Sequence, residues 1–280
     1  TPGAAAAWCA TLDGQDAGPW VSIGVGSNLL FDDAGIRGVV VRIGRAMAKI
    51  TVEGPRLTAQ GGAWTPYVAL AAGRAGLAGI EHVVGIPGTF GGLVVMNGGS
   101  LRRSIGTQLD WIDWLDADGT ATRIPGPDAG FGYRQSALQR RRGAILAAGR
   151  TLTPGNRADI QAEMRTILRN RRTKLPLKLP NCGSVFLSSP ELYDTIGPPG
   201  QAIEEAGLRG LRAGQAQIAP GHGKFIVNHG GARAADVLTL IARARRAVQA
   251  RTGMWMDAEV RHVRPDATLV AAHVTADNMP

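Results

Sequence analysis

Cysteine is scarce in this chain of 280 residues, which contains only Cys9 and Cys182. Two cysteines cannot build the disulfide framework of a small secreted domain or a four-thiolate metal site. Long apolar runs are also missing, because no stretch approaches the roughly 18 residues that a membrane-spanning helix needs. The chain does not begin with a charged region followed by an apolar one, as a secretory signal does. These absences predict a protein of the reducing cytoplasm that does not enter a membrane.

Lysine is rare as well, because only four of the 31 basic residues are lysines, although the net charge is +9. The arginines cluster at residues 140–142, 169–172 and 243–246. The planar fork of arginine suits phosphate and carboxylate groups, so a small polyanionic ligand is favoured. Solvated basic faces are the alternative, and a codon preference for Arg, Ala and Gly explains part of the excess. Nucleic acid is disfavoured, because the basic runs lack interleaved aromatic residues and a recognition motif.

Glycine, in contrast, is abundant and concentrated in two stretches. The first, GVGSNLL at residues 24–30, directly follows a strand predicted to begin at Trp20. Glycine permits positive φ and has no Cβ, so such a loop can bring N–H groups close to phosphate; a plain turn is the alternative. The second, residues 79–100, holds seven glycines, more than a helix or strand needs. It predicts that the backbone approaches a ligand closely.

Local patterns predict a mixture of helices and strands. Asp118-Gly119 is a hairpin turn signal, Asn156 can cap a helix, and Gly253 can end one. His222 and His229 lack partners at metal-ligand spacing, so they are interpreted as structural or surface residues and no metal is predicted. The predicted elements are a short helix at 4–12, strands at 20–25, 38–44, 144–152 and 254–263, hairpins at 49–59 and 111–124, helices at 65–76, 156–168 and 234–251, and a loosely attached tail after Arg264.

Six motifs then occur in order: GVGSNLL, GIEHVVGIPGTFGGLVVMNGGS, FGYRQSAL, RRTKLP, NCGSVF and AEVRHV. Each motif alone is weak. Together, over residues 20–263, they resemble the UDP-N-acetylenolpyruvoylglucosamine reductases (MurB), flavoenzymes that complete UDP-N-acetylmuramic acid in bacterial cell-wall synthesis. Between Arg134 and Ser184 the chain has no room for a long tyrosine-bearing loop, so it is similar to the shorter, second type of this family.

The resemblance implies an α+β protein. The expected FAD-binding fold is that of the vanillyl-alcohol oxidase (PCMH-type) superfamily, and a C-terminal α+β domain is expected to bind the substrate. We place the first domain at residues 1–154, with two subdomains that meet near residue 46, the second at 155–264, and a tail at 265–280. The family implies a cytoplasmic, monomeric oxidoreductase of peptidoglycan biosynthesis, and thereby of cell-wall biogenesis, cell shape and cell division. Its expected partner is a UDP-linked sugar, with neither nucleic acid nor membrane.

The resemblance also assigns residues to the site. The catalytic serine, arginine and glutamate fall on Ser184, Arg134 and Glu259. Substrate binding is assigned to Tyr133, Lys174 and Asn228. The FAD-binding residues are Gly24, Val25, Gly26, Ser27, Asn28, Leu29, Ile86, Pro87, Gly88, Thr89, Gly91, Gly92 and Asn97.

The chemistry that the family performs explains these residue types. NADPH reduces the flavin, and hydride then adds to the enolpyruvyl methylene carbon, so that negative charge develops on the substrate carboxylate. Arg134 is a permanent planar cation that suits this carboxylate. Glu259 would orient or polarise the same region, or hold a proton if its pKa is raised. Ser184 would deliver the proton to the adjacent carbon, directly or through water. Lys174 is expected near the phosphates or the nicotinamide cofactor.

We expect FAD to be noncovalent, because residues 24–30 and 85–100 contain no histidine or cysteine for attachment. The chain departs from the family pattern in two places. The usual GSVFKNP is GSVFLSSP at residues 183–190, and only 23 residues precede GVGSN. These departures keep two alternatives open, a paralogue that reduces a related unsaturated nucleotide sugar and a flavin-binding protein without turnover.

Overall fold

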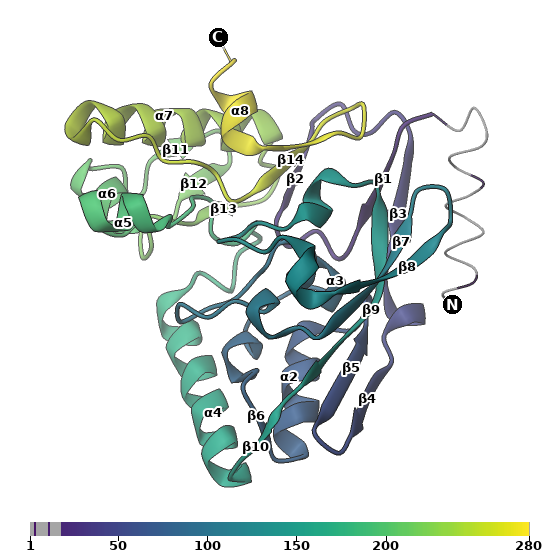
Figure 1. Ribbon diagram of the computed structural model, residues 1–280. Helices are drawn as coiled ribbons and strands as arrows, with labels where there is room; N and C mark the ends of the chain where they lie inside the picture. Colours follow the sequence, from purple (N-terminus) through teal and green to yellow (C-terminus); the bar gives the residue numbers. More distant parts are fainter. Residues whose placement is uncertain (1–2, 4–10, 12–17, 280) are drawn as a thin grey trace. The chain divides into compact units, whose positions relative to one another are not determined.

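The structure is a computed structural model that describes residue 3, residue 11 and residues 18–279. The chain forms two compact units (Figure 1). Unit 1 consists of Thr1–Val25 and Val39–Arg171, and unit 2 of Gly26–Gly38 and Arg172–Pro280. The short helix predicted at residues 4–12 lies outside the described residues. The domain limits at residues 154 and 264 stay predictions.

A five-stranded antiparallel sheet forms the centre of unit 1, with strand order β4-β5-β9-β7-β8. The two predicted hairpins, β4 with β5 and β7 with β8, are confirmed. The predicted strand at 144–152 is β9, which pairs with β5 on one side and β7 on the other. The bounds of the five strands are Ile50–Glu53 (β4), Arg56–Gln60 (β5), Trp111–Asp116 (β7), Ala121–Pro125 (β8) and Gly143–Thr151 (β9).

Helices cover this sheet in unit 1, and Figure 1 shows α2 (Thr65–Arg74) beside it. The helix begins at Thr65, the first residue of the predicted range, and has a proline in its first turn. The helix predicted from Asn156 is α4 (Arg157–Lys174), and Asn156 Oδ1 accepts a hydrogen bond from the Ala158 N–H at 2.8 Å. The apolar face of α4 packs into the same core as that of α2. The remaining elements are β1 (Trp20–Ile23) paired in parallel with β3 (Val39–Arg42), β6 (Leu77–Ala78) paired with β10 (Thr153–Pro154), and α3 (Phe90–Val95).

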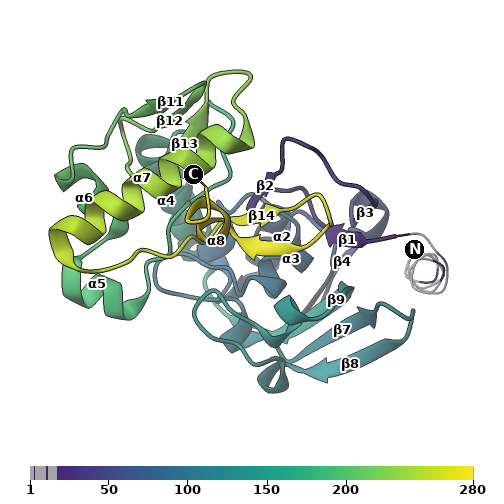
Figure 2. The same ribbon diagram turned by 90° about the horizontal axis from the view of Figure 1, so that it is seen from above.

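Unit 2 has a core of its own, in which helices pack on a small antiparallel sheet (Figure 2). The predicted helix at 234–251 is α7 (Ala234–Thr252), which ends at Gly253 with φ 76°. The sequence predicts an apolar face on this helix, and its residues are all buried because they recur on one side: Val237, Leu240, Ile241, Ala244 and Val248. The other elements are β11 (Arg212–Ala213), β12 (Ala216–Ile218), β13 (Ile226–Asn228), α5 (Pro190–Ile196) and α6 (Pro199–Glu205).

A second sheet of unit 2 has the order β15-β14-β2 and joins distant parts of the chain. Strand β2 (Leu29–Phe31) follows the first glycine stretch and runs parallel to β14 (Arg261–Val263). The strand predicted at 254–263 is shorter than expected, because only β14, at its C-terminal end, forms a strand. The predicted loose tail is wrong, because β15 (Leu269–Ala271) pairs with β14 and α8 (Ala272–Ala276) buries two alanines. Such small side chains give a weak hydrophobic signal but pack closely.

Candidate functional site

Ser184 and Glu259, the predicted catalytic serine and glutamate, lie on neighbouring segments of unit 2. The Glu259 N–H donates to the Val185 oxygen at 2.7 Å, and Phe186 forms an antiparallel bridge with Ala258. Val185 and Phe186 are fully buried, whereas Ser184 and Glu259 are half-buried. The core thus holds the two segments in place and leaves the two polar residues at its edge.

The first glycine stretch also contacts the segment that carries Glu259. Asn28 Nδ2 donates to the main-chain oxygen of Glu259 at 3.2 Å, and the Arg261 N–H donates to the Asn28 oxygen at 3.0 Å. Gly183 has φ 79°, and a Cβ built on it would lie 3.5 Å from the Ser27 oxygen. Residues of the predicted cofactor loop therefore meet both predicted catalytic segments within unit 2.

The two predicted FAD-binding stretches also meet each other, in unit 1. A Cβ built on Gly24 would lie 3.2 Å from the Thr89 Cβ and closer still to the Thr89 hydroxyl. Thr89 is buried and caps α3, because its hydroxyl accepts from the Gly92 N–H at 3.3 Å. Only glycine at position 24 allows this approach.

Part of the second glycine stretch serves protein packing rather than a ligand. A Cβ on Gly91 would lie 3.0 Å from the Gly61 oxygen, and one on Gly99 would collide with the main chain of Arg103. Gly88 has φ 144°, which L side chains rarely adopt. Within this stretch Pro87 and Gly92 are exposed. At several positions, glycine is therefore required because the protein's own main chain approaches closely. This reason adds to the predicted close approach of a ligand.

Arg134, the predicted catalytic arginine, lies in unit 1 and is held against Asn97. Its guanidinium donates to the Gly99 oxygen at 2.8 Å and to the Asn97 oxygen at 3.3 Å. The Asn97 amide donates to the Gly132 oxygen at 2.6 Å and accepts from the Gly106 N–H at 2.8 Å. Arg134 and Asn97 have φ of 54° and 43°, and such strained backbone gathers at functional sites.

The predicted substrate-binding residues occupy three different settings. Tyr133 is exposed, and the Arg134 guanidinium lies 5.3 Å from the centre of its ring. The Asn228 Oδ1 accepts from the Gly230 N–H at 2.8 Å and so shapes the turn after β13. Lys174 is exposed at the end of α4.

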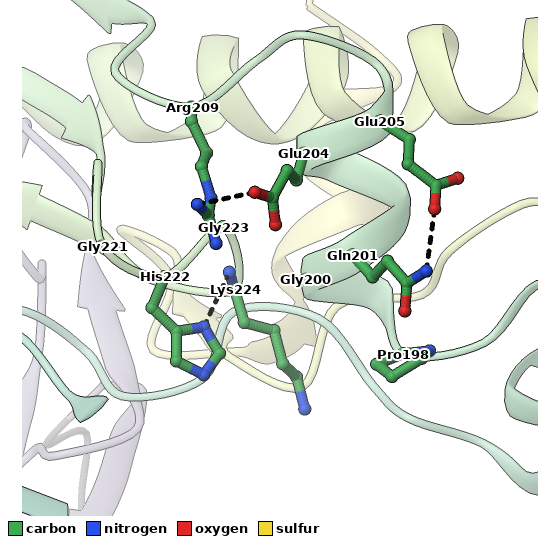
Figure 3. Close-up of a pocket in the computed structure, with 10 residues that line it drawn as sticks. All are labelled: Pro198, Gly200, Gln201, Glu204, Glu205, Arg209, Gly221, His222, Gly223 and Lys224. Carbon is green, nitrogen blue, oxygen red and sulfur yellow. Dashed lines mark hydrogen bonds and ion pairs between the residues drawn. The ribbon is translucent and has the colours of Figure 1, made fainter. Parts of the chain in front are cut away.

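Unit 2 contains a hollow of about 610 Å³ (Figure 3). A second hollow, of about 460 Å³, is lined by residues 173–176 and shares Gly221 and His222 with the first. The larger one is lined by Pro198, Gly200, Gln201, Glu204, Glu205, Arg209, Gly221, His222, Gly223 and Lys224. The sequence motifs do not indicate the larger hollow, because its walls come from α6 and from loops outside the six motifs. The second hollow, in contrast, includes residues 173–176 of the RRTKLP motif.

The charges around the larger hollow are partly paired. Arg209 forms an ion pair with Glu204 at 2.7 Å, and Lys224 Nζ donates to the Ser188 hydroxyl at 2.8 Å. Burial lowers the pKa of His222, and the positive charges of Lys224 and Arg209 lower it further. The His222 ring is therefore neutral at pH 7. The sequence predicts that His222 is a structural or surface residue, and in the structure His222 lines both hollows.

Within residues 18–279, His, Cys, Asp and Glu side chains do not gather in threes as a metal site would require. In the same part of the chain, every helix is too short or too polar to cross a lipid bilayer.

Comparison with known proteins decides the family. Residues 175–263 match the family model for the UDP-N-acetylenolpyruvoylglucosamine reductase C-terminal domain, and residues 11–125 match that for an FAD binding domain. UDP-N-acetylenolpyruvoylglucosamine reductase 1 of Corynebacterium glutamicum is 45% identical over 259 residues, covering 92% of this chain and 77% of that protein. The chain belongs to the UDP-N-acetylenolpyruvoylglucosamine reductase family.

Other members of this reductase family agree with the assignment. The reductase of Heliobacterium modesticaldum is 42% identical over 260 residues, covering 93% of this chain and 82% of that protein. The crystal structure of the reductase from Thermus caldophilus matches with a TM-score of 0.75 and 32% identity, over 88% of this chain and 86% of that one. The predicted family, the FAD-binding fold with its C-terminal α+β domain, and the class of FAD-dependent oxidoreductase are confirmed.

Proposed function

We propose that this protein reduces the enolpyruvyl group of UDP-N-acetylglucosamine enolpyruvate to UDP-N-acetylmuramate, a peptidoglycan precursor, with FAD as cofactor and NADPH as reductant. Family membership supports the reaction. The observation that carries the assignment of residues is the meeting of Asn28, Ser184 and Glu259 in unit 2. A predicted cofactor loop and two predicted catalytic residues are there built into one set of hydrogen-bonded segments. We further propose that the enzyme is a cytoplasmic monomer.

The residues present fit FAD. Gly26 has φ 77°, and a Cβ built on it would have only the Phe31 ring nearby, at 3.7 Å. Space therefore remains beside this loop, where the main chain of Gly26–Leu29 can hold the cofactor phosphates. When bound, FAD supplies the hydride that reaches the substrate.

The catalytic roles follow from the chemistry of the side chains. Arg134 would bind the substrate carboxylate through its planar fork and stabilise the negative charge that develops there. The Ser184 hydroxyl would give its proton to the carbon next to that carboxylate. Glu259, on the paired segment, would orient the same part of the substrate. In this proposal, Arg134 binds the substrate carboxylate and stabilises its charge, Glu259 orients the substrate, and Ser184 delivers the proton.

The two adjoining hollows suit the UDP part of the substrate. A diphosphate needs cations and hydrogen-bond donors, which Lys174 and Lys224 offer on either side of the neutral His222 ring. The Asn228 amide orders the turn that follows the neighbouring strand. We therefore propose that Lys174, Lys224 and His222 contact the nucleotide.

A second candidate is the reduction of a related unsaturated nucleotide sugar. It is favoured by the change from the usual GSVFKNP to GSVFLSSP, which places Ser188 under Lys224 at the edge of the larger hollow. A different hydrogen-bond pattern at this wall could select a different sugar nucleotide.

The deciding experiment uses anaerobic holoenzyme. NADPH is expected to bleach the flavin, and the UDP-enolpyruvyl sugar is then expected to restore its colour while the substrate gains two mass units, as one hydride plus one proton require. Yellow protein that NADPH does not bleach would instead favour a flavin-binding protein without turnover. Bleached enzyme that this sugar does not reoxidise would favour the second candidate.

A further inference from the structure

The C-terminal tail, predicted at residues 265–280 and described to residue 279, lies beyond the match to the C-terminal family domain, which ends at residue 263. It is nevertheless an ordered part of unit 2. Ala272 and Ala276 of α8 are fully buried in the core that also contains α7. Arg245 of α7 donates to the two carboxylate oxygens of Asp277 at 3.0 and 2.8 Å. The Arg245 side chain is 6% exposed, and a bidentate pair in such a place fixes geometry.

The tail hydrogen-bonds to the main chain on both sides of Glu259. The Ala258 N–H donates to His273 Nδ1 at 2.9 Å, and the Ala272 N–H donates to the Val260 oxygen at 2.9 Å. The groups of Glu259 itself face the other way, toward Val185 and Asn28. The segment that carries Glu259 thus lies between the tail and the segments of Ser184 and the cofactor loop.

The chemistry of His273 suits an acceptor at this position. Nδ1 accepts from Ala258, so this nitrogen carries no proton, and Nε2 faces the Asp257 carboxylate at 3.5 Å. Burial lowers the pKa of His273, as do the charges of Arg245 and Arg261, while Asp257 and Asp277 oppose this. The neutral ring required by the hydrogen bond is therefore the favoured form near pH 7.

We propose that the C-terminal tail positions the catalytic segment of this enzyme, and that His273 fixes the main chain of Glu259 by accepting the Ala258 N–H. This inference rests on the proposed function, in which Ser184 and Glu259 act only after hydride has left the flavin. His273 is a positioning residue, because it acts through the main chain of residues 258–260. Small displacements of a catalytic group, of about 1 Å, can slow a reaction about 10²-fold.

The test compares His273→Ala with His273→Asn, because the Asn Oδ1 lies close to the place of Nδ1 and can accept the same hydrogen bond. Val274→Ala, at an exposed neighbouring position of α8, is the matched control. Stopped-flow absorbance measures the two half-reactions separately. In His273→Ala, we expect flavin reduction by NADPH to stay within about twofold of wild type, and reoxidation by the UDP-enolpyruvyl sugar to slow about 10- to 100-fold. His273→Asn is expected to recover most of this loss, and Val274→Ala to lose none.

A second readout does not depend on activity. Hydrogen exchange of a peptide covering residues 256–260 is expected to be faster in His273→Ala, because the Ala258 N–H loses its acceptor, and close to wild type in His273→Asn. The inference is overturned if His273→Ala changes neither the reoxidation rate nor the hydrogen exchange. It is also overturned if the rates of both half-reactions and the melting temperature all decrease together. It is also overturned if His273→Asn is no better than His273→Ala.

Failure of the proposed function has a different signature. Wild-type enzyme that the UDP-enolpyruvyl sugar cannot reoxidise would reject the reaction, and the reoxidation arm of the test with it. Hydrogen exchange in the same proteins would still decide whether His273 holds residues 258–260.

Discussion

The Asn28 side chain donates a hydrogen bond to the main-chain oxygen of Glu259 at 3.2 Å. The main chain makes a second link, from the Arg261 N–H to the Asn28 oxygen at 3.0 Å. A residue of the predicted cofactor loop and a predicted catalytic residue are therefore parts of one hydrogen-bonded sheet edge. A substitution in this loop is therefore expected to alter the position of the Glu259 main chain.

Asn28→Asp is expected to weaken both the fold and the binding of FAD. The substitution replaces the amide donor with a carboxylate that faces the Glu259 oxygen, and such a change costs about 1–3 kcal/mol of unfolding free energy. Urea unfolding and the FAD retained after gel filtration measure the two effects. Asn278→Asp is the control, because Asn278 Nδ2 also donates to a main-chain oxygen, that of Val274 at 2.7 Å, but at an exposed position. Equal losses in the two variants would contradict a special link at Asn28.

Ser184→Ala is expected to separate the two half-reactions. FAD binding and its reduction by NADPH should persist, whereas reoxidation by the UDP-enolpyruvyl sugar should slow by about 10²–10⁴, the usual worth of general acid catalysis. Ser184→Cys should recover part of the rate, because a thiol can still give up a proton. Stopped-flow traces with melting temperatures provide the measurement. Near-normal reoxidation in Ser184→Ala would reject Ser184 as the proton donor and leave Glu259 as the next candidate.

Arg134→Lys is expected to slow reoxidation by another route. Lysine keeps the charge but loses the fork that donates to the Gly99 and Asn97 oxygens, so the loop and the substrate carboxylate are both held less firmly. We expect a loss of about tenfold or more in reoxidation at saturating substrate, consistent with the loss of one charge-assisted hydrogen bond. Arg123→Lys is the control, because Arg123 makes a bidentate pair with Asp113 on the exposed surface. Equal rates in the two variants would show that the fork of Arg134 is not needed.

His82 is expected to make stability depend on pH. It is fully buried, and neither ring nitrogen has a hydrogen-bond partner among the described protein groups. Burial, followed by the charges of Arg103, Arg150 and Arg134, lowers its pKa from 6.5 to about 4. Between these values the unfolded chain binds more protons than the folded one. The contribution of His82 is therefore complete above about pH 6.5 and is lost as the pH falls toward 4, up to about 3 kcal/mol.

Urea unfolding at about pH 7.5 and about pH 5 tests this contribution. His82→Leu should flatten the pH dependence while changing stability little at pH 7.5, because no hydrogen bond is lost. His222→Leu is a useful comparison, because burial also lowers the pKa of His222 but the ring is only half-buried. An unchanged slope in His82→Leu would show that other groups control the acid response.

Local features of the sequence determined the elements and the family. The hairpins around residues 50–60 and 111–125, the cap at Asn156 and the end of α7 at Gly253 all follow from patterns within a few residues. Such patterns depend on the backbone preferences of single residues and on the spacing of apolar residues along one element. Both can be read from a short stretch of the sequence. The six ordered motifs were enough to identify the reductase family, because together they span most of the chain.

Only the tertiary structure decided which distant segments meet. Nothing near Asn28 in the sequence indicates that it bonds to Glu259, and nothing near His273 indicates that it holds Ala258. The alanines of α8 have little hydrophobic signal, yet they dock the tail because their small side chains let helices approach closely. Gly91 leaves room for the main chain of Gly61, which lies thirty positions earlier in the sequence. These contacts depend on the packing of whole segments, a long-range property that the periodicity of any one segment does not contain.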